Sequence, residues 1–341
     1  MNTFIRIIDV NLNRLREGLR LLEDVARFII EDDVLTFKLK EFRHKIKNLI
    51  KEDLISHRNS INDFGKNIHT EEELSRSGLL DLTCTSFKRV QESLRVLEEI
   101  VKVTNSNSAI SFKNLRFEAY DLEKFFVKSI VPFVRKKVPN PLLYLVLSLE
   151  DCGDNDPLEI AEIGLSAGVK MLQLRWKILP DCKILELGKK LKSICNQYNA
   201  LFIVNDRPDI ALLLKSDGLH LGQDDIKPSI ARKIVGSEAV IGLSCHNIKQ
   251  LKKAHSEPID YVGVGPIFFT KTKRNPSPTT GAGLLAEIHN IKIPAVAIGG
   301  ITPKNLNEIV QFGCRRAAVV TGITMAADIR LKTKEYLEVL Q

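Results

Sequence analysis

The chain of 341 residues is 44% hydrophobic and 27% charged, so it can bury a sizeable core, and we expect two domains. Its net charge of +8 suits a polyphosphate ligand as well as nucleic acid, but basic and acidic residues alternate along the chain, which argues against nucleic acid. The longest apolar run, residues 142–149, is too short to cross a membrane, and the six cysteines form no CxxC pair. Arg6 and Asp9 interrupt the apolar start, so we expect a cytoplasmic protein with reduced thiols and no signal peptide.

Residues 1–130 are expected to form an all-α domain, because they contain few glycines and no proline. Residues 14–23 return as residues 89–98, with apolar positions on one helical stripe and the same charges outside it. The repeated charges are Arg14, Glu17, Arg20 and Glu23 in the first copy and Arg89, Glu92, Arg95 and Glu98 in the second. This pattern predicts a duplicated helical hairpin packed as a pseudo-symmetric bundle.

Two interpretations of these repeated charges stay open. They could form a solvated face of ion pairs, each contributing about 0.2–0.5 kcal/mol. They could instead line a phosphate-binding pocket between the two copies, which we favour because the same charges recur in the same order.

A domain boundary is expected at residues 131–141, where three prolines frame a basic patch typical of a linker. We therefore expect an all-α domain at residues 1–130 and a second domain at residues 131–341. In the second domain short apolar strands alternate with amphipathic helices. The expected strands are 142–147, 169–175, 201–205, 218–221, 239–243, 261–265, 294–298 and 317–320. Eight such units predict a (β/α)₈ barrel of the α/β class, with an open doubly wound sheet as the alternative.

Chemistry in such barrels lies at the carboxyl ends of the strands, and the second expected strand ends in an amide and two cations. Alternate side chains of a strand share a face, so Gln173, Arg175 and Lys177 point one way while Leu174 and Trp176 point the other. Such a face suits a phosphate, although on its own it is more typical of a solvated strand end.

Two acidic residues and two glycine turns follow other strands. Asp206 and Asp225, together with nearby cations, suit a Mg²⁺-bound diphosphate, although either could merely cap a helix. Gly300 and the Thr321-Gly322 turn precede helices after the seventh and eighth strands, where barrels recurrently bind phosphate. Two phosphate sites in one barrel mouth predict joining or exchange between two phosphorylated substrates.

The strand ends carry the patterns QLRxK, ND, GQxD, GxSxH, GPIFxTxTK and AIGGI in this order, and in this combination the domain resembles the thiamine-phosphate synthase family. The resemblance implies a Mg²⁺-dependent transferase that joins hydroxymethylpyrimidine diphosphate to thiazole phosphate and releases diphosphate. It implies metal binding by Asp206 and Asp225 and catalytic roles for Arg175, Lys177 and Lys273. The substrate-binding residues that it implies are Gln173, Leu174, Arg175, Trp176, Lys177, Asn205, Ser244, Thr270, Lys271, Thr272, Lys273, Gly300, Thr321 and Gly322.

Two positions depart from the family pattern. Trp176 stands where the family usually has an acid, and Thr321-Gly322 stands where a Ser-Ala pair is more usual. Neither change removes a charge on which the assignment depends.

The N-terminal runs 13–24 and 88–99 resemble a small helical domain often fused to this synthase, a family associated with phosphorylation of hydroxymethylpyrimidine phosphate. The resemblance therefore implies small-molecule substrates, and it leaves a homo-oligomer open. Two alternatives are weighed. A noncatalytic or isomerising barrel that binds only thiazole phosphate would have no diphosphate to hold, and a basic nucleic-acid-binding regulator would lack the expected interleaved aromatic residues.

Overall fold

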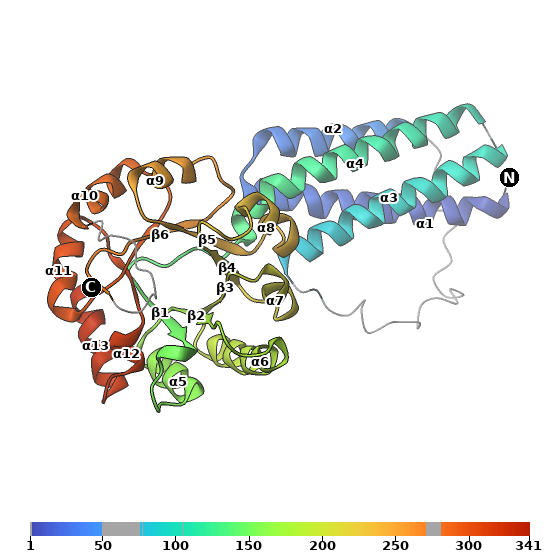
Figure 1. The fold of residues 1–341 in the computed structure, drawn as a ribbon. Helices are drawn as coiled ribbons and strands as arrows, with labels where there is room; N and C mark the ends of the chain where they lie inside the picture. Colours follow the sequence, from blue (N-terminus) through green and yellow to red (C-terminus); the bar gives the residue numbers. More distant parts are fainter. Residues whose placement is uncertain (1, 50–75, 77, 105, 271–280) are drawn as a thin grey trace. The chain divides into compact units, whose positions relative to one another are not determined.

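The computed structural model describes residues 2–49, 76, 78–104, 106–270 and 281–341. The chain divides into two compact units, Met1–Val134 and Arg135–Gln341, which we call the bundle and the barrel (Figure 1). Each unit has its own apolar core.

In the described residues, the bundle has four long helices. They are α1 (Asn2–Val25), which continues into the π-helical turn η1 (Ala26–Ile30), α2 (Asp33–Leu49), α3 (Leu79–Thr104) and α4 (Ser106–Val134). α1 and α4 each pack against both α2 and α3. The two predicted apolar stripes are buried in the common core, at residues 15, 19, 22 and 26 and at residues 90, 94, 97 and 101. The predicted helical duplication is thus present as two packed hairpins.

The barrel closes in the order β1 to β8, with every neighbouring pair parallel. Its strands are β1 (Leu142–Ser148), β2 (Met171–Arg175), β3 (Leu201–Asn205), β4 (Gly218–Leu221), β5 (Val240–Cys245), β6 (Tyr261–Val264), β7 (Ala295–Ile298) and β8 (Arg316–Val319). β1 pairs with β8, so Tyr144 lies beside Ala318 and no edge strand is left. The predicted eight-stranded barrel is confirmed, and the closed order excludes the open sheet.

Helices surround the strands, as the outer ring in Figure 1 shows. They are α5 (Pro157–Ala167), α6 (Asp181–Gln197), α7 (Pro208–Leu213), α8 (Pro228–Val235), α9 (Ile248–Ala254), α10 (Gly281–Ala286), α11 (Pro303–Gln311), α12 (Thr321–Thr324) and α13 (Ile329–Leu340), with 3₁₀ turns at Leu149–Asp151 and Glu287–Asn290. Alternation along β1 separates two apolar layers, because Leu143 and Leu145 pack outward under the helices whereas Tyr144 and Val146 pack inside the barrel. Inward positions near the carboxyl ends of the strands therefore face a common interior.

The segment expected to be a linker, residues 131–141, is helical only in residues 131–134, and residues 135–141 form neither helix nor strand. α4 includes Pro132 and ends at Val134, whose side chain packs on the bundle core. Immediately afterwards Arg135 pairs with Asp260 of the barrel at 2.5 Å and Lys136 pairs with Asp217 at 2.7 Å. The basic patch is thus explained by ion pairs that fix the first residues of the barrel.

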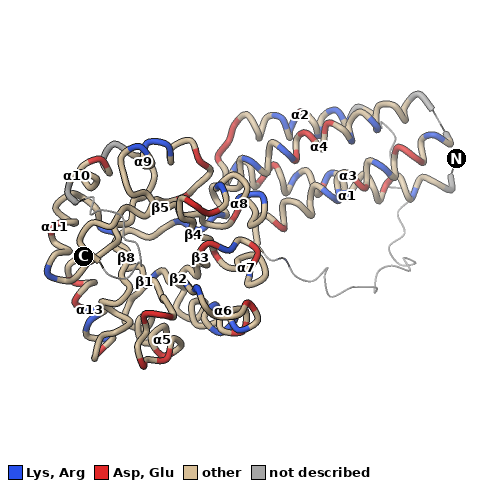
Figure 2. The backbone as a smooth tube through the Cα atoms, viewed as in Figure 1, with Lys and Arg blue, Asp and Glu red and all other residues tan. Residues whose placement is uncertain are grey.

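Charge is distributed along the bundle helices with both signs interspersed, as Figure 2 shows. None of the helices in the described part of the chain combines the length and the apolar character that a membrane span requires.

Candidate active site

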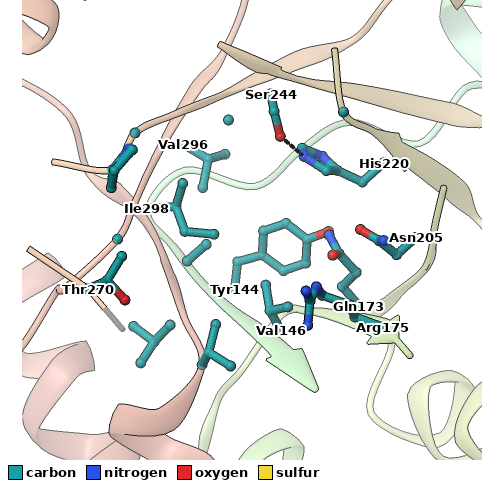
Figure 3. Close-up of a pocket in the computed structure, with 18 of the residues that line it drawn as sticks. Tyr144, Val146, Gln173, Arg175, Asn205, His220, Ser244, Thr270, Val296 and Ile298 are labelled. Atoms are coloured by element: carbon teal, nitrogen blue, oxygen red, sulfur yellow. Dashed lines mark hydrogen bonds between the residues drawn. The ribbon is translucent and has the colours of Figure 1, made fainter. Parts of the chain in front are cut away.

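A cavity of about 990 Å³ opens at the carboxyl ends of the barrel strands (Figure 3). It brings together most of the residues that the sequence singled out. These are Gln173, Arg175, Lys177, Asn205, Asp206, Asp225, Ser244, Thr270, Gly300, Thr321 and Gly322.

Two of the expected substrate-binding residues do not line the cavity. Leu174 is 0% exposed in the apolar layer outside the strands, and Trp176 packs against the same layer. Strand alternation explains this placement, because their neighbours Gln173 and Arg175 take the inward positions. Lys271, Thr272 and Lys273 lie outside the described residues.

The cationic side of the cavity is formed at the end of β2 and the adjacent end of β1. Arg175 donates from Nη1 to Ser148 Oγ at 2.7 Å, and the same nitrogen lies 3.9 Å from Glu150 Oε2. Ser148 in turn donates to Asp151 Oδ2 at 2.6 Å. Glu150 also accepts a hydrogen bond from the backbone N–H of Lys177. These contacts hold the Arg175 guanidinium in place at the cavity wall.

Glu150 and Asp151 were not predicted as site residues, although both line the cavity. The available signal was their position directly after β1, where the same strand-end rule applies.

Asp206 and Asp225 meet within hydrogen-bonding reach at the ends of β3 and β4. Asp206 has a left-handed backbone with φ of 61°, and its N–H donates to the carbonyl of His220 at 2.8 Å. Asp225 Oδ2 accepts from the N–H of Gly222 at 2.6 Å. Burial, and then the hydrogen bond and charge of Asp225, raise the pKa of Asp206 to about 7, while Lys177 and Arg175 act in the opposite direction.

This carboxylate pair fits a divalent cation only in part. Within the described ranges no group of three or more His, Cys, Asp or Glu side chains is placed to enclose a metal ion. Mg²⁺, however, is usually held by one or two carboxylates and completed by phosphate oxygens and water. The donor set therefore fits a cation that arrives with, or is completed by, a phosphorylated ligand.

Five polar side chains form a continuous hydrogen-bonded series across the cavity floor, which we call the floor network. Gln173 Nε2 bonds Tyr144 Oη at 2.6 Å, and Tyr144 Oη lies 3.1 Å from Tyr261 Oη. Tyr261 Oη is 2.9 Å from His220 Nδ1, and His220 Nε2 is 2.9 Å from Ser244 Oγ, the contact drawn in Figure 3. Tyr144, Tyr261 and His220 were not predicted, because their contacts exist only when the closed barrel brings β1, β4 and β6 together across its interior.

The opposite side of the cavity is built from bare backbone after β7 and β8. Gly299 and Gly300 have φ values of 102° and 62°, and a Cβ at Gly300 would lie 2.3 Å from the carbonyl oxygen of Phe269. Thr302 then caps α11 in a reciprocal capping box with Asn305. After β8, a Cβ at Gly322 would lie 2.3 Å from Tyr336 Oη. Both turns therefore leave backbone groups accessible where side chains could not fit.

The repeated charges of the bundle lie on its surface or in ion pairs, and Arg95 does both, because it is exposed and contacts Glu98 at 3.0 Å. Arg14, Glu17, Arg20, Arg89, Glu92 and Arg95 are exposed. The two remaining glutamates pair at matching places, Glu23 with Arg43 and Glu98 with Arg116, both at 3.1 Å. Burial alone would raise the pKa of Glu98, but Arg116, with Arg95 and Lys102, holds that pKa below its ordinary value. This distribution is the one expected of a solvated, ion-paired face.

Comparisons with known proteins identify relatives for both units. Residues 143–323 match the family described as Thiamine monophosphate synthase, and residues 6–125 match the ThiD2 family. The chain is 36% identical over 335 residues to a thiamine-phosphate synthase of Prochlorococcus marinus, covering 97% of this chain and 95% of that protein. It is 38% identical over 332 residues to a thiamine-phosphate synthase of Thermosynechococcus vestitus, covering 97% and 93%. Thiamine phosphate pyrophosphorylase from Pyrococcus furiosus, a solved structure, matches 58% of this chain and 95% of its own at 31% identity, with a TM-score of 0.54.

Proposed function

This chain belongs to the thiamine-phosphate synthase family and is a transferase of thiamine biosynthesis, and we propose which substrates it joins and which residues hold them. The substrates are hydroxymethylpyrimidine diphosphate and thiazole phosphate, and the products are thiamine phosphate and diphosphate. The observation that supports the proposal is that two chemically different regions, each suited to an anion, line one cavity. One combines Arg175 and Lys177 with the carboxylate pair, and the other consists of the glycine turns after β7 and β8.

The diphosphate is assigned to the side with the charged residues. Gln173, Arg175, Lys177, Asn205 and Lys273 hold hydroxymethylpyrimidine diphosphate, while Ser244 contacts the pyrimidine. Asp206 and Asp225 hold Mg²⁺, which when bound neutralises charge on the diphosphate. Thr270, Thr272, Gly300 and the Thr321-Gly322 turn hold the phosphate of the thiazole.

The proposed reaction needs no protein nucleophile. The amino group of the pyrimidine donates electrons into the ring, so the bond between the methylene carbon and the diphosphate oxygen breaks with its electron pair leaving on the diphosphate. The lone pair of the thiazole nitrogen then forms the new bond to the methylene carbon. Arg175 and Lys177 stabilise the negative charge that grows on the leaving group, which is the largest contribution expected of this site.

For the bundle we propose phosphorylation of hydroxymethylpyrimidine phosphate to the diphosphate, which supplies the substrate of the barrel. Its support is the match of residues 6–125 to the ThiD2 family, together with the sequence resemblance of the two repeated runs. Among the described residues of the bundle, six of the eight repeated charges are exposed, and the other two, Glu23 and Glu98, form ion pairs.

The decisive experiment supplies the purified chain with both phosphorylated substrates and Mg²⁺ and follows formation of thiamine phosphate. Turnover that requires both substrates supports the assignment, and its absence would refute it. A second assay supplies hydroxymethylpyrimidine phosphate, ATP and Mg²⁺ without the thiazole. Release of the pyrimidine diphosphate supports the kinase assignment, and a folded chain that makes none contradicts it without affecting the first assay.

A further inference from the structure

The hydroxyl of Tyr336, on α13, contacts both glycine turns that border the cavity. It donates a hydrogen bond to the carbonyl oxygen of Ile301, the residue after Gly300, at 2.9 Å. The same hydroxyl lies against Gly322, where a Cβ would be 2.3 Å from its oxygen. Tyr336 is 1% exposed, whereas the residues that it contacts line the cavity. One buried hydroxyl therefore connects the turn after β7 with the turn after β8 from behind the cavity wall.

This phenol has no part in the proposed reaction, and its hydrogen bond has only one possible direction. The carbonyl oxygen of Ile301 has no hydrogen to give, so Tyr336 must be the donor. Burial raises the pKa of Tyr336 to about 12, so the phenol keeps that hydrogen near neutral pH. Because Ile301 is itself buried, removal of the hydroxyl would leave its carbonyl group without a donor, which is unfavourable.

Asn305, in the first turn of α11, holds the same segment from a second direction. Its Nδ2 donates to the carbonyl oxygen of Gly300 at 3.0 Å, and its Oδ1 accepts from the N–H of Thr302 at 2.7 Å. The carbonyl oxygen of Gly299 accepts from the N–H of Phe268 at 3.0 Å. Together with the bond from α13, three successive carbonyl groups of the turn are thus bound to protein donors.

These bonds determine where the N–H groups of the turn point. In a trans peptide the N–H points away from the carbonyl of the same peptide, so the N–H groups of Gly300 and Ile301 point away from the donors that bind the carbonyls before them. Both residues line the cavity, and neither N–H bonds to another described residue. Successive N–H groups of a turn can form a concave site for an anion. The turn therefore offers its donors to the cavity while its acceptors are occupied by the protein.

We propose that Tyr336 and Asn305 are positioning residues for the phosphate of the thiazole substrate, because they bind the carbonyl groups of the turn after β7 and so leave its N–H groups to face the ligand. A peptide released from these bonds could rotate and bring its carbonyl oxygen, with its partial negative charge, towards the phosphate. Tyr336 has a second role, since its contact with Gly322 sets the spacing between the two glycine turns. The inference rests on the proposed function, in which these turns hold the thiazole phosphate.

The test compares binding of the two substrates by the purified full chain. Calorimetry measures the affinities for thiazole phosphate and, in the presence of Mg²⁺, for hydroxymethylpyrimidine diphosphate, in wild type, Tyr336→Phe and Asn305→Ala. Phenylalanine keeps the buried ring and alanine suits a helix, so each change removes mainly the bonds to the turn. The affinity for thiazole phosphate is expected to fall about tenfold or more in each variant. The affinity for the pyrimidine diphosphate should stay within about twofold of wild type.

Two control variants lose comparable bonds elsewhere in the barrel. Tyr198→Phe loses the phenol bond to Glu162, and Asp156→Ala loses the side-chain cap of α5. Both controls should keep the wild-type affinity for both substrates. Thermal unfolding of every variant shows whether it is folded.

A general loss of structure would weaken both ligands, so equal losses for the two substrates would overturn the inference. Folded Tyr336→Phe and Asn305→Ala proteins with unchanged affinities would overturn it as well. Either result leaves the proposed function intact, since wild type still binds both substrates. Wild-type protein that binds the pyrimidine diphosphate but no thiazole phosphate would overturn the assignment of the turns and the inference together. A folding defect in one variant leaves the other to decide.

Discussion

Asp206 shows how a single residue can be adapted for ligand binding rather than for stability. Its backbone is left-handed, and its carboxyl group is buried against a second acid, Asp225. Neither feature stabilises the metal-free fold, since left-handed backbone is unfavourable for most residues and adjacent carboxylates repel each other. A cation bound by the two carboxylates would relieve their repulsion.

Asp206→Asn and Asp225→Asn should each abolish Mg²⁺-dependent thiamine phosphate formation without unfolding the barrel. Asparagine keeps the size of the side chain and tolerates the left-handed conformation, but it removes the negative charge. The measurement is steady-state turnover over a range of Mg²⁺ concentrations, with circular dichroism as the control for folding. Wild-type turnover by both variants would contradict the assignment of Asp206 and Asp225 as Mg²⁺ ligands.

The raised pKa of Asp206 predicts that the stability of the metal-free protein depends on pH. The folded state raises the pKa of Asp206 from 3.8 to about 7, so it favours the protonated form. The stabilising contribution is therefore complete below about pH 4 and is lost as the pH rises through 7. The Asp206→Asn variant has no carboxyl group to ionise at this position, so it does not lose this stability. In EDTA at pH 8 the Tm of the variant should therefore exceed that of wild type by a few degrees. Equal Tm values at pH 8 would contradict the raised pKa, whereas near-equality at pH 4 is expected.

At the scale of elements, the turn between β7 and α11 depends on backbone that only glycine adopts easily. Gly300 has a φ of 62° and no room for a methyl group beside the Phe269 carbonyl. The turn precedes a capped helix, so its conformation determines which backbone groups face the cavity.

Gly300→Ala should weaken thiazole phosphate binding by at least about tenfold while leaving pyrimidine diphosphate binding nearly unchanged. The added Cβ must displace the turn that we propose holds the phosphate, but the cations at β2 are on the other side of the cavity. Calorimetry with each ligand separately makes the comparison. Gly283→Ala is the control, because a Cβ at Gly283 meets nothing within 4 Å. An equal loss for both ligands would argue against separate anion sites.

The bundle offers a second comparison at this scale, between buried and exposed charges. Glu98 is 4% exposed, and Arg116→Ala removes its contact at 3.1 Å and leaves it the more exposed Arg95 at 3.0 Å and Lys102 at 3.6 Å. We expect this substitution to destabilise the bundle by about 1–3 kcal/mol. Arg20→Ala changes an exposed residue and should cost about 0–1 kcal/mol.

Urea unfolding followed by far-ultraviolet circular dichroism measures both variants of the bundle. Fluorescence provides the control, because the single tryptophan of the chain, Trp176, lies in the barrel. Equal destabilisation by the two substitutions would show that the ion pair with Glu98 has no special weight.

Much of the fold could be read from the sequence because its signals are local. Strand ends and glycine turns lie within a few residues of one another, so Gln173, Arg175, Asp206 and Gly300 could be placed at the cavity before any contact was known. Alternation also predicted that Trp176 faces away from it, although the residue was counted with the binding stretch.

The rest depends on contacts that no local pattern records. Tyr144 and Tyr261 are separated by 117 positions, and each looks like an ordinary apolar strand residue. Their meeting requires the curvature and closure of the whole barrel. The exposure of Arg20 and Arg95 likewise follows from how four helices share one core, which periodicity alone does not determine.

At the scale of the whole molecule, the position of the junction between the units has a measurable consequence. Asp217 and Asp260 of the barrel are bound by Lys136 and Arg135, the first residues after α4. Burial alone would raise the pKa of Asp217, but its bonds to Lys136, Lys192 and the N–H of Phe202 hold that pKa below its ordinary value. Arg135 and Lys136 are therefore expected to contribute to the stability of the barrel.

A fragment of residues 135–341 should fold and make thiamine phosphate at nearly the rate of the full chain, because it contains the complete cavity and its own core. A fragment of residues 138–341 should have a clearly lower Tm, since it leaves Asp217 and Asp260 with fewer partners. Thermal unfolding and turnover of both fragments provide the test. Identical Tm values would show that the basic segment contributes nothing to the barrel.

The repeat in the bundle carries a consequence for its ancestry. If the ancestor was a half-length chain that formed a symmetric dimer, each substitution in that chain would have changed two symmetric contacts at once. With both copies in one chain each contact can change alone, and the two copies have diverged, since Gly18 stands where the other copy has Ser93 and Glu98 is buried more deeply than Glu23. Gene duplication followed by divergence thus allows a single asymmetric ligand site, which a twofold-symmetric dimer would have to present twice.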